Sequence, residues 1–237
     1  MRNGLRIGVV IPARDEEQAI GAVVSAIPAW ADDIVVADNG SADQTADAAR
    51  RAGARVVVEP EAGYGAACLA GIGVLEPVDI VVFVDGDNSD YPGDMAELVD
   101  PIAAGTVSMT IGSRVLGKAE PGSLTPQQRW GNWLATRLVH LIWGVRYSDL
   151  GPFRAIGRSA LERLKMQDRT YGWTVEMQIK AAEQGLKSLD VPVRYRKRIG
   201  TSKISGTVKG VVLAGTKILS IIALRGMARL RGAARPN

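Results

Sequence analysis

Residues 79–87 read DIVVFVDGD, in which five apolar side chains, Ile80 to Val84, end in two aspartates one residue apart. A continuous apolar run of this kind indicates a strand buried on both faces of a parallel sheet. Because charge is costly inside such a strand, Asp85 and Asp87 are expected at its carboxyl end, where open α/β sheets bind ligands. Carboxylates at that place suit Mg²⁺ or Mn²⁺ carrying a substrate's phosphates. The alternative is a plain polar turn, since Asp-Gly is common turn chemistry.

Strand and helix patterns alternate on both sides of this run. Apolar runs typical of strands cover residues 5–11, 33–37, 55–58 and 79–84, and helical periodicity covers residues 16–27, 43–52 and 63–75. This alternation predicts an α/β fold with a doubly wound, mostly parallel, Rossmann-like sheet. Downstream, the patterns predict helices at 95–103, 129–144, 159–164, 174–184 and from 207 to about 230, strands at 106–112 and 189–195, and a loop over 113–128.

Charge is distributed unevenly along the 237 residues. The net charge is +4, but 11 basic residues and no acidic residue follow Asp190, whereas the preceding part holds 18 basic and 25 acidic residues. A mildly acidic body with a basic tail implies an anionic partner for the tail, such as lipid headgroups, a phosphorylated substrate or nucleic acid. Length and composition suit one large globular domain, or one domain with an appendage.

Cysteine usage and the first residues bear on the compartment. The single cysteine, Cys68, excludes an internal disulfide framework and fits a reducing compartment. No N-terminal signal is visible, because the first apolar run leads directly into patterned sequence. Both features predict a cytoplasmic protein.

The second strand pattern also ends in a carboxylate, Asp38, which is followed by Asn39-Gly40-Ser41. Asp38 is expected at a strand tip beside the Asp85 strand, where it accepts hydrogen bonds from a ligand such as a base or a ribose. Helix capping is the competing interpretation for Asp and Ser residues here, and we favour capping for Asp43.

Five segments within the first 115 residues carry a resemblance in their order and spacing: VVIPARDEE (9–17), IVVADNGSADQT (34–45), GYGAA (63–67), VFVDGDNSDYP (82–92) and GSR (112–114). Together they resemble the family 2 glycosyltransferases of GT-A fold. Three later segments extend the resemblance to about residue 205: SDLGPFRAI (148–156), YGWTVEMQIKAAEQG (171–185) and VPVRYRKRIGTSKI (191–204). They look most like the dolichol-phosphate mannose and polyprenyl-phosphate glucose synthase branch.

The resemblance implies a GT-A domain over residues 1–206, with a nucleotide-sugar half (1–115) and an acceptor half (116–206), followed by a basic amphipathic helical tail (207–237). By matching motifs, it assigns the nucleotide-sugar site to Pro12, Arg14, Glu16, Asp38, Gly65, Asp85, Gly86 and Arg114. It further implies a divalent cation, Mg²⁺ or Mn²⁺, bound by Asp85, Asp87 and Ser89, with Gly86 leaving room between the carboxylates.

Transfer from a nucleotide sugar expels a diphosphate, and cations stabilise the negative charge that grows on the leaving oxygen. Arg114 and a basic cluster near residue 200 are the candidates for this role. The cluster is expected to bind the acceptor or the diphosphate through Arg196, Arg198, Ser202 and Lys203. A solvated basic face is the alternative, which we favour for Lys197, whereas we favour phosphate binding for Arg198 and Lys203.

The acceptor decides which further residues take part in catalysis beside Asp87. A sugar hydroxyl needs a carboxylate general base, whereas an ionised phosphate acceptor needs none. Asp149 and Glu176 are the acidic residues expected to approach an acceptor, although Glu176 instead caps or pairs within its helix on the alternative interpretation. Arg154 is expected to hold either an acceptor phosphate or Glu176.

Two apolar stretches bear on the partner. Trp130, Trp133 and Trp143 lie on the predicted helix 129–144, where Trp favours a membrane boundary and packing on the domain is the alternative. The run 208–224 is interrupted by Lys209 and Lys217, which makes it a poor membrane span. It better fits an amphipathic interfacial helix with arginines facing anionic lipid, and a dimerisation helix is the competing interpretation.

The sequence and the resemblance thus predict a metal-dependent, inverting glycosyltransferase that moves a hexose from a nucleotide-diphosphate sugar, of the UDP-glucose or GDP-mannose type, to a polyprenyl phosphate. We expect it to be peripheral on the inner face of the membrane. The alternatives are transfer to a soluble small acceptor and, from another class, a non-catalytic nucleotide- or nucleic-acid-binding module. The chain lacks basic strands interleaved with aromatic residues that stack bases, so no nucleic-acid partner is expected.

Overall fold

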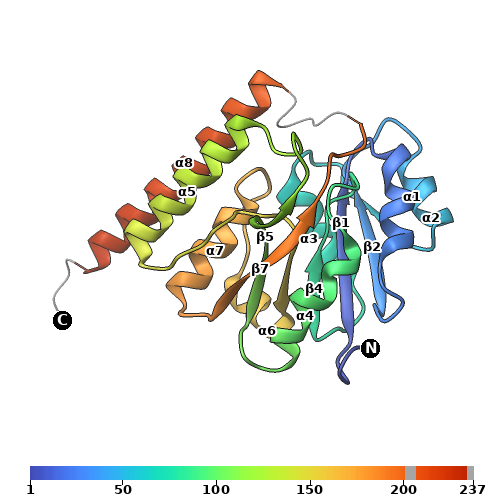
Figure 1. Cartoon of the computed structure of the whole chain (residues 1–237), viewed down its shortest axis with the longest axis horizontal. Helices are drawn as coiled ribbons and strands as arrows, with labels where there is room; N and C mark the ends of the chain where they lie inside the picture. The colour runs from blue at the N-terminus through green and yellow to red at the C-terminus, as the bar shows by residue number, and fades with distance from the viewer. Residues whose placement is uncertain (201–206, 234–237) are drawn as a thin grey trace.

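The structure is a computed structural model that describes residues 1–200 and 207–233. Its centre is one seven-stranded sheet with helices on both faces (Figure 1). In chain order, the strands are β1 (Ile7–Ala13), β2 (Asp33–Asp38), β3 (Arg55–Val58), β4 (Ile80–Phe83), β5 (Met109–Ala119), β6 (Arg154–Gly157) and β7 (Ser188–Tyr195). The helices are α1 (Glu17–Ala26), α2 (Thr45–Arg51), α3 (Tyr64–Val74), the 3₁₀ turn η1 (Pro92–Asp94), α4 (Met95–Ala103), α5 (Pro126–Trp143), α6 (Arg158–Leu164), α7 (Trp173–Glu183) and α8 (Val208–Ala233).

The strand order is β3-β2-β1-β4-β6-β5-β7, in which β6 alone runs antiparallel to both of its neighbours. The chain moves outward from β1 to β3 and then returns to the other side of β1 with β4. This reversal confirms the predicted doubly wound, mostly parallel sheet. In such a sheet, ligands bind outside the carboxyl ends of the strands at the point of reversal, which here lies between β1 and β4.

Apolar residues form a core on each face of the sheet. On one face, Val10, Val81, Phe83 and Ile111 pack beneath α3, α5, α6, α7 and α8. On the other face, Val9, Ile11 and Val82 pack beneath α1, α2 and α4. Because both faces are covered, the central strands read as continuous apolar runs, which is why the sequence identified them.

The stretch 113–128 differs from the predicted loop. Strand β5 continues to Ala119, and its outer part pairs with β7 through Lys118 and Ala119 after an irregularity in the register. Helix α5 then begins at Pro126, preceded by Thr125, whose hydroxyl and the Gln128 side chain form a capping box. Long-range pairing with a strand some 75 residues later, rather than local apolar pattern, makes this polar segment a strand.

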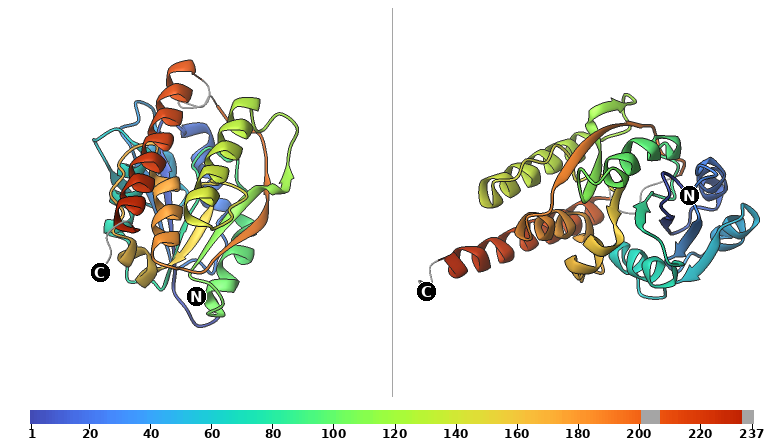
Figure 2. Two further views of the ribbon diagram at one scale, coloured as in Figure 1. Left: turned by 90° about the vertical axis from the view of Figure 1, so that its left-hand side faces the viewer. Right: turned by 90° about the horizontal axis from the view of Figure 1, so that it is seen from below.

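Helix α8 lies beside α5 along one side of the molecule (Figures 1 and 2). Within the described residues, Lys209–Arg231 is a helix of 23 residues that is long and apolar enough to cross a membrane. Its most apolar 18 residues have a mean hydropathy of 1.7, and 11% of them are buried. Two of its cations pair with the body, whereas Lys209, Arg229 and Arg231 are exposed. Lys217 pairs with Asp168 at 2.8 Å, and Arg225 pairs with Glu183 at 2.7 Å, so both turn toward the body.

Candidate active site

The carboxyl ends of β1, β2 and β4 bring three of the predicted site segments to one edge of the sheet. Ala13 pairs with Asp38, and Val10 pairs with Phe83, so the residues after each strand emerge side by side. Asp38 is buried, and its Oδ1 accepts hydrogen bonds from the amide and the hydroxyl of Ser41. Pro12 is a buried residue within β1, while Arg14 is exposed at the rim of this edge. These positions agree with a ligand site at the sheet edge.

Asp85 and Asp87 stand directly after β4, as the sequence predicts. A Cβ at Gly86 would lie 3.0 Å from the Ala13 Cβ, so glycine permits the close approach of this loop to the end of β1. Asp87 Oδ1 accepts hydrogen bonds from the Ser89 amide at 2.9 Å and from the Ser89 hydroxyl at 2.5 Å. Ser89 is buried and therefore supports Asp87 in this structure.

Negative charge accumulates around these two aspartates. Burial and the neighbouring Asp87 raise the pKa of Asp85 to about 7. Asp90 is 1% exposed, and burial together with Asp85 and Asp87 raises its pKa well above the ordinary value. The Oδ1 atom of Asp90 is buried with no hydrogen-bond partner in the described part of the chain. A buried acidic group of this kind is costly unless a positive charge approaches it.

These residues fit a divalent cation that shares its ligands with a substrate. Aspartate oxygens are hard ligands, which suit Mg²⁺ and Mn²⁺. In the described ranges 1–200 and 207–233, however, no three His, Cys, Asp or Glu residues are grouped so as to hold a metal ion by themselves. The remaining ligands would therefore come from diphosphate oxygens and water, as is common for Mg²⁺.

The basic segment that follows β7 is joined to the acidic loop. The amide of Ile199 donates to the Asp87 carbonyl, and Arg196 donates through Nε to the carbonyl of Asn88 at 2.6 Å. Arg198 forms ion pairs with Glu16 and, at 3.0 Å, with Asp87 Oδ2. Arg196 thus supports the loop, while Arg198 places positive charge beside Asp87. The predicted phosphate ligands Ser202 and Lys203 lie outside the described residues.

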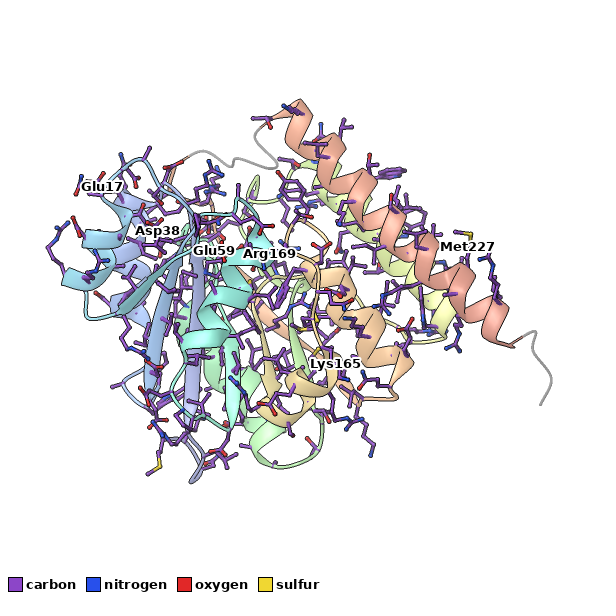
Figure 3. The ribbon with its side chains drawn as sticks, turned by 180° about the vertical axis from the view of Figure 1, so that it is seen from behind. Glu17, Asp38, Glu59, Lys165, Arg169 and Met227 are labelled. Atoms are coloured by element: carbon purple, nitrogen blue, oxygen red, sulfur yellow. The ribbon has the colours of Figure 1, made fainter. Side chains whose placement is uncertain are left out.

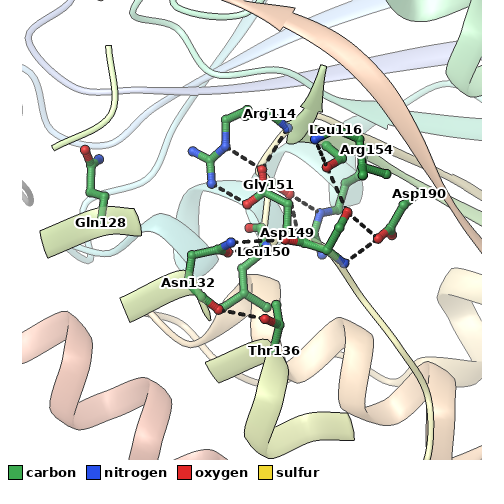
Figure 4. A network of polar contacts seen from close by, with 12 residues as sticks. Arg114, Leu116, Gln128, Asn132, Thr136, Asp149, Leu150, Gly151, Arg154 and Asp190 are labelled. Atoms are coloured by element: carbon green, nitrogen blue, oxygen red, sulfur yellow. Dashed lines mark hydrogen bonds and ion pairs between the residues drawn. The ribbon is translucent and has the colours of Figure 1, made fainter. Parts of the chain in front are cut away.

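Arg114 lies next to this acidic cluster and also lines a recess in the surface, which is described below. Its guanidinium binds both oxygens of Asp149, at 2.8 and 2.7 Å (Figure 4). Although burial alone would lower the pKa of Arg114, Asp149 raises it above the ordinary value. The guanidinium carbon of Arg114 lies 5.2 Å from the centre of the Tyr195 ring, and Tyr195 pairs with Asp90 of the acidic loop. The positive charge of Arg114 opposes the rise in the pKa of both Asp85 and Asp90.

The recess is a pocket of about 720 Å³ between the outer part of β5 and α5. Its charged and polar lining includes Arg114, Arg129, Asn132, Arg137, Arg146 and Asp149. Since Asp149 is already paired with Arg114, the other three arginines give the pocket a positively charged lining, which suits an anion.

Comparison with known proteins identifies the family. Residues 8–165 match glycosyl transferase family 2. This chain is a family 2 glycosyltransferase. The match covers the acidic loop, the edge at β1 and β2, and the pocket residues of β5 and α5, which agrees with the resemblance seen in the sequence.

Two relatives resemble the glycosyltransferase over nearly its whole length. An uncharacterised glycosyltransferase of Mycobacterium tuberculosis is 36% identical over 219 residues, which cover 89% of this chain and 95% of the relative. The dolichyl-phosphate hexose transferase of Haloferax volcanii is 32% identical over 219 residues, with 91% and 93% coverage. The second relative supports the predicted polyprenyl-phosphate branch.

A solved structure shows the same fold. Glucosyl-3-phosphoglycerate synthase from Mycobacterium tuberculosis, in complex with Mn²⁺, UDP-glucose and phosphoglyceric acid, matches with a TM-score of 0.76. The identity is 22%, and the alignment covers 94% of this chain and 80% of that chain. The likeness confirms the predicted GT-A architecture for the glycosyltransferase.

The geometry does not support Asp149 as a general base in this glycosyltransferase. Asp149 is fully buried, and its two carboxylate oxygens accept hydrogen bonds from the Arg114 guanidinium and the Arg114 amide. A base must offer an oxygen to the proton that it abstracts. Asp149 instead holds Arg114 in place between the acidic loop and the pocket.

Glu176 and Arg154 also have structural partners rather than the predicted ones. Glu176 is buried, pairs with Lys180 at 2.7 Å and accepts the amides of Gln167 and Asp168. The pairing within its helix that we considered as the alternative is therefore present. Arg154 is fully buried and donates to the carbonyls of three residues, Leu150, Gly151 and Thr174. Burial lowers its pKa to about 10. These contacts do not include Glu176.

Gly65 lies in α3, where its Cα faces another segment of the chain. A Cβ at Gly65 would lie 2.0 Å from the Asp168 carbonyl oxygen, so close backbone packing explains the glycine. Sequence reasoning missed Tyr64 and Asp90, which lie beside Asp85 in the structure. Asp90 belongs to the motif VFVDGDNSDYP, and a third acidic residue in that motif was the available signal.

Proposed function

We propose that this glycosyltransferase transfers a hexose from a nucleoside-diphosphate sugar, of the UDP-glucose or GDP-mannose type, to a polyprenyl phosphate, with inversion at the anomeric carbon. The observation that carries the proposal is the position of Arg114, which lines a pocket rich in arginines and lies over Tyr195, the residue that pairs with Asp90 of the acidic cluster. The relative from Haloferax volcanii is named for dolichyl phosphate, which agrees with a phosphate acceptor.

The donor half of the proposed reaction uses the sheet edge. Asp38 and Glu16 would face the nucleoside, with Pro12 and Arg14 beside them. Asp85 and Asp87 would hold Mg²⁺ or Mn²⁺, and the related solved structure contains Mn²⁺ and UDP-glucose. When bound, the cation would neutralise charge that develops on the departing diphosphate. Arg198, paired with Asp87 and Glu16, supplies a further positive charge at the same place.

The acceptor half uses the pocket beneath α5. A phosphate monoester is ionised near neutral pH, so it attacks without a general base, provided that cations hold it. Both candidate bases, Asp149 and Glu176, are engaged in ion pairs. This engagement favours a phosphate over a sugar hydroxyl as the attacking group. Arg129, Arg137 and Arg146 would hold the acceptor phosphate.

We assign the GT-A domain to residues 1–206, its nucleotide-sugar half to 1–115, its acceptor half to 116–206 and the helical tail to 207–237. The tail would contact lipid on the cytoplasmic side of a membrane. Apart from the ion-paired Lys217 and Arg225, residues 210–228 carry no charge. The large exposed apolar side chains of α8 include Val212, Leu213, Leu219, Leu224 and Met227.

The ion pairs of Lys217 and Arg225 hold α8 sideways against the body, and Met227 lies on the side away from the sheet (Figure 3). A helix held in this way cannot cross a bilayer without leaving its partners. We therefore infer that α8 lies in the plane of the membrane with its apolar face among the lipids. The exposed Trp130 and Trp133 of α5 fit the same boundary.

The test is a transfer assay with radiolabelled UDP-glucose and GDP-mannose, each with Mg²⁺ or Mn²⁺. A short polyprenyl phosphate is the first acceptor and 3-phosphoglycerate the second. We expect label in the organic phase with the polyprenyl phosphate and none after addition of EDTA. Product with 3-phosphoglycerate alone would replace the lipid acceptor by a soluble one, and full activity in excess EDTA would contradict the cation.

The pocket assignment has its own test. Replacing Arg129 with Ala should raise the KM for the polyprenyl phosphate at least tenfold, about 1.4 kcal/mol, because a charge-assisted contact is lost. The KM for the donor should not change. Arg158→Ala on α6 is the matched control, since Arg158 pairs with Glu162 on the surface. Equal effects of the two substitutions would contradict the pocket.

A further inference from the structure

Tyr64 is the first residue of α3, and its hydroxyl donates a hydrogen bond to Asp85 Oδ1 at 3.0 Å. Asp85 receives a second contact from its own loop, where its amide donates to Asp90 Oδ2 at 3.3 Å. The tyrosine hydroxyl is the donor in this contact, because a carboxylate oxygen accepts. The motif GYGAA was assigned to the nucleotide-sugar site through Gly65, but it is the tyrosine that reaches the acidic loop.

The backbone on both sides of Tyr64 is fixed by close contact with residues 168–170. A Cβ at Gly63 would lie 2.0 Å from the Arg169 carbonyl oxygen, and a Cβ at Gly65 would lie 2.0 Å from that of Asp168. The amides of Gly65 and Ala66 donate to the carbonyls of Thr170 and Arg169, at 3.1 and 2.8 Å. These contacts leave little freedom for the first turn of α3.

The segment 168–170 is itself held at both ends. Asp168 Oδ1 accepts the amides of Thr170 and Gly172, and its Oδ2 pairs with Lys217 of α8. Arg169 pairs with Glu59 and Glu61, which follow β3 (Figure 3). The tyrosine hydroxyl is therefore presented to Asp85 from a backbone that hydrogen bonds and ion pairs hold on both sides.

A carboxylate in an acidic cluster needs such a support if it is to bind a cation in one orientation. Repulsion from Asp87 and Asp90 favours turning of the Asp85 side chain away from them. A hydrogen bond to one carboxylate oxygen fixes the side chain and leaves the other oxygen for a ligand. Removal of a group that orients a metal ligand typically lowers metal affinity about 10- to 100-fold.

We propose that Tyr64 is a positioning residue, which fixes the Asp85 carboxylate for binding of the divalent cation together with the nucleoside diphosphate. The proposal rests on the proposed function, because it takes Asp85 as a cation ligand. It adds a residue outside the acidic loop, and it explains why α3 begins with a tyrosine between two glycines.

The test is the affinity for Mn²⁺ of the full-length Tyr64→Phe variant, measured by electron paramagnetic resonance of free Mn²⁺ in the presence of UDP and, separately, of GDP. We expect affinity to fall about tenfold or more with the diphosphate that supports binding to the unmodified protein. Tyr147→Phe is the matched control. Tyr64 is partly buried and Tyr147 is buried, but the Tyr147 hydroxyl contacts the Gln178 carbonyl instead of an aspartate. Its loss should leave Mn²⁺ affinity unchanged.

A double-mutant cycle with Asp85→Asn separates positioning from a general structural effect. If Tyr64 acts through Asp85, adding Tyr64→Phe to Asp85→Asn should lower Mn²⁺ affinity no further. Additive losses, or a Phe variant that binds Mn²⁺ like the unmodified protein, would overturn the proposal. A Phe variant that no longer folds would overturn it as well, since the hydroxyl would then serve the fold itself. Absence of Mn²⁺ binding by the unmodified protein with either diphosphate would instead contradict the proposed function.

Discussion

Asp90 is a buried carboxyl group whose surroundings favour the binding of a cation nearby. It is buried beside two other aspartates, and one of its oxygens has no partner among the described residues. A buried carboxyl group with an unsatisfied oxygen reduces stability unless a ligand compensates for it. The sequence places three aspartates within six residues, and the structure shows that all three share one electrostatic environment.

The substitution Asp90→Asn tests this interpretation. Removal of the charge should raise the free energy of unfolding of the metal-free protein at pH 8, by about 1–3 kcal/mol if the full cost of the unsatisfied group is recovered. The additional stabilisation by Mn²⁺ and nucleoside diphosphate should become smaller. Urea denaturation with and without Mn²⁺ measures both effects. A less stable metal-free variant would show that Asp90 is already compensated.

Asp149 is tested by separating stability from catalysis. Because it is fully buried and paired with Arg114, Asp149→Asn should lower the free energy of unfolding by about 3 kcal/mol or more. It should also raise the KM for both substrates, since Arg114 lies between the two halves of the site. Urea unfolding and initial rates measure the two effects. If stability is unchanged and kcat falls strongly, the result would instead support Asp149 as the general base.

In helix α8, the structure places two charged side chains differently from what the sequence pattern predicts. Two of its charges lie within the apolar stretch, and both are paired with acidic residues of the body. Neutralised in this way, they do not prevent lipid contact by the opposite face. The helix therefore offers an apolar surface of the kind that amphipathic helices bury at a membrane boundary.

Vesicle binding tests this surface. We expect the protein to sediment with phosphatidylglycerol-containing vesicles, and Leu219→Asp with Leu224→Asp should reduce binding at least tenfold, because a charge is costly among acyl chains. Val58→Asp is the matched control, since Val58 is 57% exposed on β3, away from α8. Release of the protein by alkaline carbonate is expected for a helix in the membrane plane. Resistance to carbonate would indicate a spanning helix, and a stable dimer without vesicle binding would indicate a second copy as the partner.

The free energy of unfolding of the whole protein should depend on pH because the pKa of Asp85 is raised. Asp85 has a pKa of about 7 in the folded chain and an ordinary value of 3.8. Between these values the folded state binds more protons than the unfolded state, so the contribution of Asp85 to stability falls as pH rises from about 4 to 7. Thermal unfolding of the metal-free protein should show this fall, and Asp85→Asn should make the dependence shallower. Parallel curves for the two proteins would contradict the raised pKa.

Much of the fold could be predicted because its signals are local. The runs at 79–84 and 33–37 are buried on both faces, so their apolar pattern is unambiguous, and alternation with helices restricts the topology. The ends of these strands also located Asp38, Asp85 and Asp87 at a common edge. The antiparallel direction of β6 and the outer half of β5 were not predictable, because long-range pairing decides both.

Within the candidate site, sequence identified residue types that carry charge but not the partner of each charge. Asp149, Glu176 and Arg154 looked available for catalysis, and each is buried with a structural partner. Which charges meet depends on contacts between segments about 35 to 180 residues apart, such as Arg114 with Asp149 and Arg198 with Glu16. Local patterns hold no information about such contacts.

The amino-acid order by itself determined the doubly wound sheet, the family and the acidic loop at the end of β4, because each follows from local periodicity or from a contiguous motif. Tertiary structure alone decided that Arg114 lines the arginine-rich pocket next to the acidic loop, that Tyr64 reaches Asp85, and that Lys217 and Arg225 of α8 pair with the body. These three facts depend on the packing of distant segments, in which burial and the pairing of charges select one partner among many.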